Sequence, residues 1–281
     1  MKKISLFIGI LSFVFSFSFV LFTFAQNAFG AETKPNFEAR PKVIYGDDNR
    51  QDYFEVSDRA LLEVADSTVA VVNSAHLKPL EEGWELVTTS FGQDMSLCND
   101  ERFFEQPTAA YCSGFLVAPD LVVTAGHCVA DYNCDKTNFI FGFQMQDSTR
   151  AVEHFSKDQV YQCKKVVKRE QQAKAQDYAL VRLDRKVKNY KQLVLRTKRV
   201  IEKGDELVIV GHPSGLPMKI ANGATVRDFA KDKSYFVANT DSYGGNSGSA
   251  IFNRRTLEVE GILVRGYTDF QYDSKNSCMR S

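Results

Sequence analysis

The sequence has no excess of charge of either sign, because 35 Lys and Arg residues are balanced by 35 Asp and Glu residues. A protein that binds nucleic acid through phosphates needs a surplus of basic residues on one face. The sequence also lacks low-complexity tracts and internal repeats, which excludes solenoids and repeat arrays. We therefore expect a globular protein with no nucleic-acid partner. Its 281 residues are enough for one large domain or two small ones with a real core.

Metal-ligand motifs are missing as well. None of the six cysteines lies in a CxxC pair or has histidines at zinc-ligand spacing, so we expect neither a metal site nor a cofactor. An even number of cysteines in an exported chain favours disulfides, with the pairing left open by the count alone. The cysteines are Cys98, Cys112, Cys128, Cys134, Cys163 and Cys278.

The N-terminus carries an export signal. The basic start Met1-Lys2-Lys3 is followed by an apolar stretch over residues 4–24 and then by small residues at Ala25, Ala28 and Gly30. This pattern predicts a secretory signal peptide over residues 1–30, followed by a propeptide or spacer over 31–42. The alternative is an uncleaved anchor, since the apolar stretch is just long enough to span a bilayer. We expect a secreted or periplasmic protein with no stable membrane association after cleavage.

Short runs rich in Val, Ile, Phe and Tyr recur after residue 42, separated by turn residues. Many short strands without alternating helices indicate an all-β sandwich or barrel. One helix is expected near 57–65, with Ser57 as its cap. The basic stretch around 164–169 is interpreted as solvated surface, and the charged stretch 184–203 as a linker between two halves. The expected strands are 69–72, 114–117, 121–124, 139–143, 178–183, 206–210, 235–238, 250–252 and 259–264.

Three segments carry residues typical of nucleophilic catalysis. Val122-Val123-Thr124-Ala125-Gly126-His127-Cys128 ends a strand in a small-residue turn that presents a histidine. Asp177 opens the alternating run Asp177-Tyr178-Ala179-Leu180-Val181. Gly244-Gly245-Asn246-Ser247-Gly248-Ser249 is a glycine-rich loop around a serine. Alone, such segments are more often a structural histidine, a turn aspartate and a β-turn.

Taken together, the three segments point to one chemistry. The order His127, Asp177, Ser247 is that of chymotrypsin-like enzymes and differs from the orders in subtilisin and α/β-hydrolases. The hydrolase nucleophile motif is also broken, because Ser249 stands where its final glycine belongs. Asp184 is the rival acid, and we favour Asp177 because Asp184 lies toward the charged linker.

At these residues the sequence resembles the trypsin/chymotrypsin family, and it looks most like the bacterial branch that includes glutamyl endopeptidases. The resemblance rests on the Gly-Gly-Asn-Ser-Gly-Ser motif, on the turn Gly211-His212-Pro213 and on the segment from Val43 to Arg50. It implies an all-β, chymotrypsin-like fold of two packed antiparallel β-barrels with the active site at their interface. Residues 43–184 would form the N-terminal barrel, and residues 185–281 the linker and the C-terminal barrel.

The resemblance also implies roles for the site residues. Ser247 is the nucleophile and needs an adjacent base, which is His127. Asp177 orients the imidazole and stabilises its charged form. The N–H groups of Gly245 and Ser247 form the oxyanion hole. His212 more readily shapes its turn than takes part in the chemistry.

Specificity is less clearly encoded. Asp241 and Ser242 occupy the places where trypsin-like enzymes build the floor of the pocket for Arg or Lys at P1, although Asp241 can instead brace its loop by local hydrogen bonds. Leu263 stands where the glutamyl endopeptidases use a histidine. The edge Val264-Arg265-Gly266 would pair with the substrate backbone, and Arg265 keeps an acidic preference open.

The resemblance implies the disulfide Cys112–Cys128 across the histidine turn. We expect Cys134–Cys163 as a second pair, which leaves Cys98–Cys278. Asn246 replaces the aspartate that pairs with the new N-terminus in trypsin. We therefore expect a different activation, by cleavage of the Lys42–Val43 bond.

The sequence thus predicts a monomeric, secreted serine endopeptidase acting on protein or peptide substrates, possible specificities being trypsin-like or glutamyl. The alternative from a different class is an inactive homologue that uses the same fold as a binding surface.

Overall fold

The computed structural model describes residues 43–172 and 176–281. The predicted signal peptide, 1–30, and spacer, 31–42, lie outside the described residues. Within the part that is described, no helix is both long and apolar enough to cross a membrane. All six cysteines are paired, as Cys98–Cys278, Cys112–Cys128 and Cys134–Cys163, which are the predicted disulfides.

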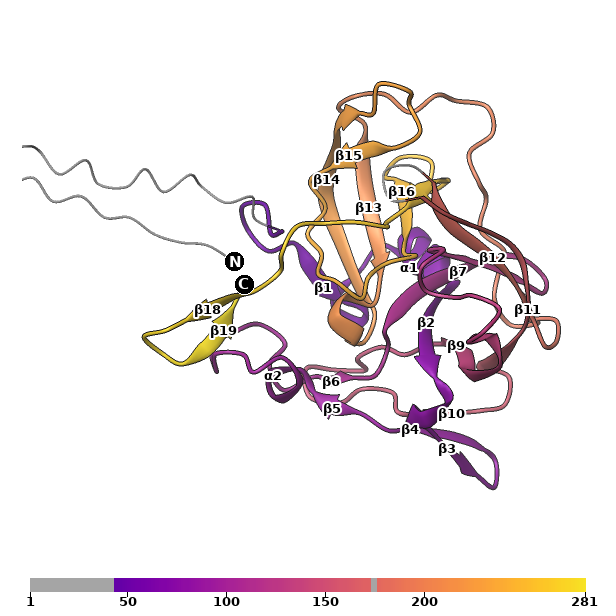
Figure 1. Cartoon of the computed structure of the whole chain (residues 1–281), viewed down its shortest axis with the longest axis vertical. Helices are drawn as coiled ribbons and strands as arrows, with labels where there is room; N and C mark the ends of the chain where they lie inside the picture. The colour runs from indigo at the N-terminus through magenta and orange to yellow at the C-terminus, as the bar shows by residue number, and fades with distance from the viewer. Residues whose placement is uncertain (1–42, 173–175) are drawn as a thin grey trace, which may run out of the picture. The chain divides into compact units, whose positions relative to one another are not determined.

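The first structural unit is a closed antiparallel barrel in the order β11-β12-β8-β7-β2-β9 (Figure 1). Every second residue of the strand from Asp177 to Leu183 is buried, whereas the strand from Thr137 to Phe141 is buried throughout. The barrel core is aliphatic and aromatic, with Val122, Phe139 and Val181 fully buried. The strands are β2 (Thr68–Asn73), β7 (Cys112–Ala118), β8 (Leu121–Thr124), β9 (Thr137–Phe141), β11 (Val160–Gln171) and β12 (Asp177–Leu183).

The second unit is a six-stranded sheet in the order β1-β14-β13-β16-β17, with β15 paired to β14. The segment 50–52 was expected in the first barrel, but it pairs with β14 of this sheet instead. The chain after Val43 is therefore attached to the half of the molecule that carries Ser247. The strands are β1 (Arg50–Asp52), β13 (Glu206–Gly211), β14 (Lys219–Phe229), β15 (Phe236–Ala238), β16 (Ala250–Asn253) and β17 (Val259–Ile262).

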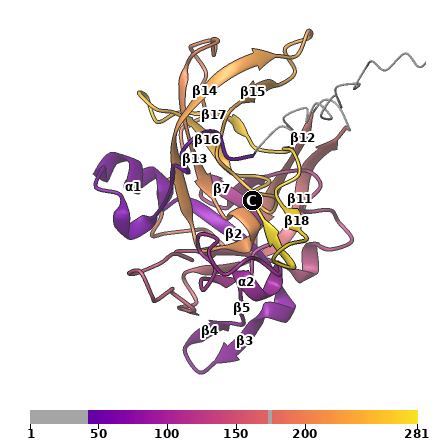
Figure 2. The same cartoon turned by 90° about the vertical axis from the view of Figure 1, so that its left-hand side faces the viewer.

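Helix α1 (Arg59–Ala65) lies beside the second sheet (Figure 2) and buries Leu61 against Val208 and Ile220. Its cap is Asp58, whose carboxylate accepts hydrogen bonds from two backbone N–H groups of the first turn. The prediction of Ser57 as the cap was therefore wrong by one residue. The expected linker, 184–203, contains no helix or named strand in the described structure.

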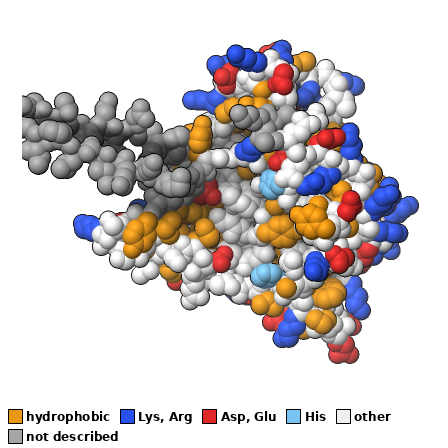
Figure 3. Space-filling model, viewed as in Figure 1, with side chains coloured by type: hydrophobic (Ala, Val, Ile, Leu, Met, Phe, Trp, Pro, Cys, Tyr) orange, Lys and Arg blue, Asp and Glu red, His pale blue; other side chains and the backbone are white. Residues whose placement is uncertain are grey.

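Strand β11 was missed by the sequence, which assigned its basic stretch only to solvated surface. The basic stretch is part of a strand and is also solvated. Lys164, Lys165 and Lys168 are exposed, and Lys and Arg side chains gather over β11 and β12 at the right of Figure 3. Pairing with β12 and β9 forms this strand despite its composition, because backbone hydrogen bonds do not depend on side-chain polarity.

The remaining elements are short and lie on the periphery. Helix α2 (Phe91–Asp94) begins at its cap Ser90. The three small sheets consist of β3 (Leu77–Leu80), β4 (Gly83–Leu86) and β10 (His154–Phe155); of β5 (Thr89–Ser90) and β6 (Pro107–Thr108); and of β18 (Gln271–Asp273) and β19 (Cys278–Arg280). The disulfide Cys98–Cys278 attaches the β18–β19 hairpin to the loop after α2.

Candidate active site

A histidine and an aspartate meet at the edge of the barrel. The turn after β8 presents His127, and Asp177 is the first residue of the neighbouring strand β12. Asp177 Oδ2 lies 2.9 Å from His127 Nδ1, and Asp177 Oδ1 accepts the backbone N–H of His127 at 3.0 Å. The carboxylate is buried and the imidazole is one-third exposed. The geometry holds the ring with Nε2 available on the side away from Asp177.

The small residue before the histidine is required by this contact. A Cβ on Gly126 would lie 2.1 Å from the carbonyl oxygen of Glu170 and 3.0 Å from Asp177 Oδ1. Any larger residue would force β11 or the carboxylate away, so Gly126 allows the turn to approach Asp177. The sequence pattern of small residues before His127 has its physical reason here.

The serine loop reaches the same place from the second sheet. The carbonyl oxygen of Ser247 accepts the N–H of Ser113 in β7 at 2.8 Å. A Cβ on Gly248 would lie 2.4 Å from Thr124 Oγ1 and 2.9 Å from the backbone nitrogen of Ala125, so the loop backbone touches the turn that carries His127. Among the described residues no hydrogen bond joins the His127 ring to the Ser247 hydroxyl. Such a bond commonly tightens only when substrate is bound.

The predicted oxyanion-hole donors are the backbone N–H groups of Gly245 and Ser247. In the described structure neither Gly245 nor Ser247 donates its N–H to another residue. The Gly244 carbonyl accepts the N–H of Ser214 at 2.6 Å, and the peptide bond that follows is trans. Because carbonyl and N–H point in opposite directions across a trans peptide, the Gly245 N–H points away from Ser214.

The side chain of Asn246 forms hydrogen bonds within the serine loop. It is buried and accepts the Ser249 hydroxyl at 2.6 Å, while its amide donates to Ser242 Oγ at 2.8 Å. His212 is fully buried in the adjacent turn, with Nδ1 3.0 Å from the Leu216 carbonyl oxygen. Burial lowers the pKa of His212 to about 4, so it is neutral and structural at neutral pH.

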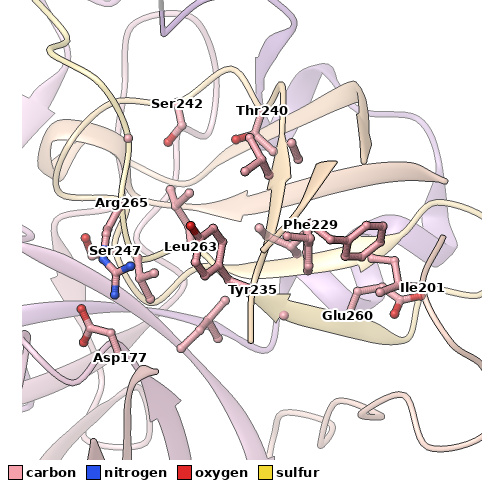
Figure 4. A pocket seen from close by; sticks show the side chains of 18 of the residues that line it. Asp177, Ile201, Phe229, Tyr235, Thr240, Ser242, Ser247, Glu260, Leu263 and Arg265 are labelled. Carbon is pink, nitrogen blue, oxygen red and sulfur yellow. The ribbon is translucent and has the colours of Figure 1, made fainter. Parts of the chain in front are cut away.

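A cavity of about 1130 Å³ adjoins the serine and is lined by both Asp177 and Ser247. Figure 4 shows Arg265 beside these two residues, and Leu263 and Tyr235 further along the cavity. Its far end is lined by apolar side chains and by Glu260. The predicted substrate-binding residues that line it are Ser242, Leu263, Val264, Arg265 and Gly266.

Asp241 departs from the expected selector role. It is missing from the described residues that line the cavity, and its two carboxylate oxygens accept the backbone N–H groups of Tyr45 at 2.8 Å and Asn49 at 3.0 Å. Burial raises its pKa, against the lowering effect of these two hydrogen bonds. Asp241 therefore binds the segment that starts at Val43 and does not face a substrate. Sequence reasoning could not see this contact, which joins residues more than 190 positions apart.

The only cluster of potential metal ligands within the described residues is Cys112, His127 and Cys128, and its two cysteines are bonded to each other. A disulfide offers no thiolate to a metal.

A closed barrel and a second sheet that meet at a His–Asp pair and a serine loop define a chymotrypsin-like fold. The family model described as trypsin-like peptidase domain matches residues 112–262, more than half of the chain, and the chain belongs to this family. No curated protein matches the sequence significantly.

Two solved structures are similar. The VesB protease of Vibrio cholerae has a TM-score of 0.51 and 14% identity, over 83% of this chain and 62% of that one. A Glu endopeptidase in complex with MPD has a TM-score of 0.49 and 20% identity, over 84% of this chain and 91% of that one. At this level of identity the likeness to VesB concerns the fold.

Proposed function

We propose that the chain is a serine endopeptidase in which Ser247, His127 and Asp177 act as a catalytic triad. The observation that carries the proposal is the Asp177–His127 pair, whose aspartate lines the same cavity as Ser247. A serine hydroxyl is a weak nucleophile and reacts only beside a base. Asp177, which forms two hydrogen bonds with His127, keeps a proton on His127 Nδ1. His127 Nε2 is then the base that activates Ser247.

The reaction proceeds in two halves. Ser247 Oγ attacks the scissile carbonyl carbon while its proton passes to His127 Nε2. The oxygen that gains negative charge is bound by the N–H groups of Gly245 and Ser247. The C–N bond then breaks, and His127 returns the proton to the leaving amine. Water repeats the sequence on the acyl-enzyme and releases the second product with the Ser247 hydroxyl restored.

A fluorophosphonate probe tests the proposal directly. It should label the purified protein and leave Ser247→Ala unlabelled, and the wild type should cleave a peptide library before labelling but not after it. The inactive-homologue alternative predicts no labelling and no cleavage even after processing. His212→Asn is a useful control, because the buried imidazole of His212 has no part in this mechanism and labelling of the folded variant should persist.

Two observations favour a preference for acidic substrate residues over a preference for basic ones. Both oxygens of Asp241 accept backbone N–H groups away from the cavity, whereas Arg265 lines the cavity beside Ser247 (Figure 4), where one of its Nη atoms also donates to the Gln172 carbonyl at 2.9 Å. A guanidinium recognises a carboxylate through paired donors. We expect the cleavage profile to favour Glu or Asp, and Arg265→Gln to reduce that preference. A profile dominated by Arg and Lys would contradict this assignment.

Export and maturation complete the proposal. The segment after the predicted cleavage point is already docked: Val43 is buried, and its carbonyl oxygen accepts the N–H of Ser242 at 3.4 Å. Asp241 holds the next residues by their backbone. Cleavage of the Lys42–Val43 bond would therefore leave the new terminus at the cavity wall that Val43 forms. N-terminal sequencing of the secreted protein should begin at Val43, and any other start would remove this step.

A further inference from the structure

The two peptide groups that flank Gly244 are each held by a hydrogen bond. The N–H of Gly244 donates to Asp269 Oδ2 at 2.5 Å, and its carbonyl oxygen accepts the N–H of Ser214 at 2.6 Å. Gly244 itself is exposed, so water would compete for both groups if the partners were missing. The bond from Ser214 orients the Gly244–Gly245 peptide, which carries the Gly245 N–H, and the bond to Asp269 anchors the preceding Tyr243–Gly244 peptide. Together they restrain the backbone torsions of Gly244, on which the direction of the Gly245 N–H depends.

The position of Asp269 is restrained by the packing of the residue that follows it. The next residue, Phe270, is buried and packs on Tyr243, with ring centroids 4.7 Å apart, and on Phe91 at 6.1 Å. The Arg50 guanidinium lies 3.8 Å from the ring centroid of Tyr243 and donates to the hydroxyl of this tyrosine at 2.9 Å. The carboxylate is thus attached to a rigid aromatic cluster beneath the serine loop.

No other described side chain performs this task. Asn246, the residue before the nucleophile, uses its amide for Ser242, Ser249 and Ser113. Burial raises the pKa of Asp269, whereas the hydrogen bond from Gly244 and the charge of Arg50 lower it. The neutral and charged carboxyl both keep an oxygen that can accept the Gly244 N–H.

We propose that Asp269 is a positioning residue for the oxyanion hole, because its hydrogen bond anchors the peptide before the exposed Gly244 and so restrains the torsions that direct the Gly245 N–H toward the charge that develops on the substrate. This inference rests on the proposed function. It assigns Asp269 no proton transfer and no contact with the reacting atoms. What it predicts is a contribution to the transition state that is absent from substrate binding.

The test compares Asp269→Ala with Asp269→Asn, whose amide oxygen can still accept the Gly244 N–H. Complete loss of an oxyanion donor typically costs on the order of 10²–10³ in kcat, so we expect a misdirected donor to cost roughly 10- to 100-fold in Asp269→Ala, with KM changed by less than about threefold. Asp269→Asn should stay within about fivefold of wild type. The affinity of a peptide aldehyde, whose adduct places an oxygen in the hole, should fall with kcat.

Asp273→Ala is the matched control. Asp273 lies in the same C-terminal segment and also accepts a backbone N–H, that of Lys275 at 2.9 Å, but its partner is in the β18–β19 hairpin. Its kcat and aldehyde affinity should equal those of wild type. Equal losses of kcat in Asp269→Ala and Asp273→Ala would overturn the inference, because they would show a general effect of the C-terminal segment. The inference would also fail if Asp269→Asn lost as much kcat as Asp269→Ala.

Gly244→Ala gives a second route that does not remove the carboxylate. An added Cβ would meet only Asp269 Oδ2, at 2.9 Å, and would push it from the N–H. We expect Gly244→Ala to lower kcat in the wild type and to add nothing in Asp269→Ala. Additive effects would overturn the inference.

An unlabelled wild type would instead refute the proposed function itself, whereas equal fluorophosphonate labelling rates of wild type and Asp269→Ala would refute only the role of Asp269.

Discussion

Asp177 binds His127 twice, through the ring Nδ1 at 2.9 Å and through the backbone N–H at 3.0 Å. One carboxylate thus fixes both the imidazole and the turn that presents it. The orientation of the ring is set by a strand of the barrel, β12, and is independent of the second sheet. Only Ser247 has to be brought to this pair from the other half of the chain.

Asp177→Asn should abolish most of the activity. The amide that replaces one oxygen cannot accept a proton from Nδ1, so the ring loses the tautomer that leaves Nε2 as a base. We expect kcat to fall roughly 10³- to 10⁴-fold with a small change in KM. Asp184→Asn is the control, since Asp184 is exposed and pairs with Arg185. An equal loss of kcat in both variants would contradict the assignment of Asp177 as the acidic member of the triad.

Lys219→Met should destabilise the fold. Lys219 is buried, forms an ion pair with Asp52 and donates to Gln106 Oε1 at 2.7 Å. Removing the cation leaves the Asp52 carboxylate buried and uncompensated, which typically costs about 3–5 kcal/mol. Urea unfolding in a Ser247→Ala background, where self-digestion cannot occur, measures the loss.

The matching control for Lys219 is Lys78→Met. Lys78 pairs with Glu85 on the exposed β3–β4 hairpin, and such surface pairs contribute little to the free energy of unfolding. Adding Asp52→Asn to Lys219→Met should recover part of the stability, because the unpaired charge is then removed. A double variant less stable than Lys219→Met would contradict this account.

His212 should make the protein sensitive to mild acid. Burial lowers its pKa from an ordinary 6.5 to about 4, so between these values the unfolded chain binds a proton that the folded protein does not. The free energy of unfolding therefore rises with pH across this window and falls on acidification. From pH 7 to pH 5 the loss is roughly 2 kcal/mol.

The variant His212→Phe tests this origin. It keeps a ring that can stack on Phe143 as the imidazole does but has no group to titrate. Unfolding of Ser247→Ala with and without His212→Phe should be compared at pH 7 and pH 5. The free energy should fall less between the two pH values in the phenylalanine variant, even though it loses the bond to Leu216 at both. An equal fall would place the acid sensitivity elsewhere.

The three disulfides should differ in their effect on stability. In the chain-entropy model the stabilisation grows with the length of the closed loop. The separations are 16 residues for Cys112–Cys128, 29 for Cys134–Cys163 and 180 for Cys98–Cys278. Replacing both cysteines of a pair by serine should therefore cost most for Cys98–Cys278, by about 2 kcal/mol more than for Cys112–Cys128. The reverse order in denaturant unfolding would show that native-state contacts dominate.

Much of the site is encoded locally and was therefore predictable. The turn before His127, the alternation that begins at Asp177 and the glycine loop around Ser247 are short patterns that become specific when they occur together in this order. The same holds for strands such as 121–124, whose Leu and Val residues predict a strand.

What the sequence did not reveal are contacts between distant segments. Asp241 suggested a substrate pocket by its spacing from Ser247, but it binds the backbone of residues near Val43. Asp269 stands in the polar stretch Tyr267-Thr268-Asp269, which has no periodicity and no motif. Strand β11 is too charged for a propensity signal and is formed by its neighbours. Tertiary pairing decides each of these cases, and no local pattern records it.

The bond between Cys98 and Cys278 encloses most of the chain, including all three residues of the His–Asp–Ser set. A single backbone cut anywhere between those sulfurs opens the ring without dividing the molecule, so both pieces migrate together until a reductant is added. For a protein that would be exposed to copies of itself, nicking within this ring does not release a fragment.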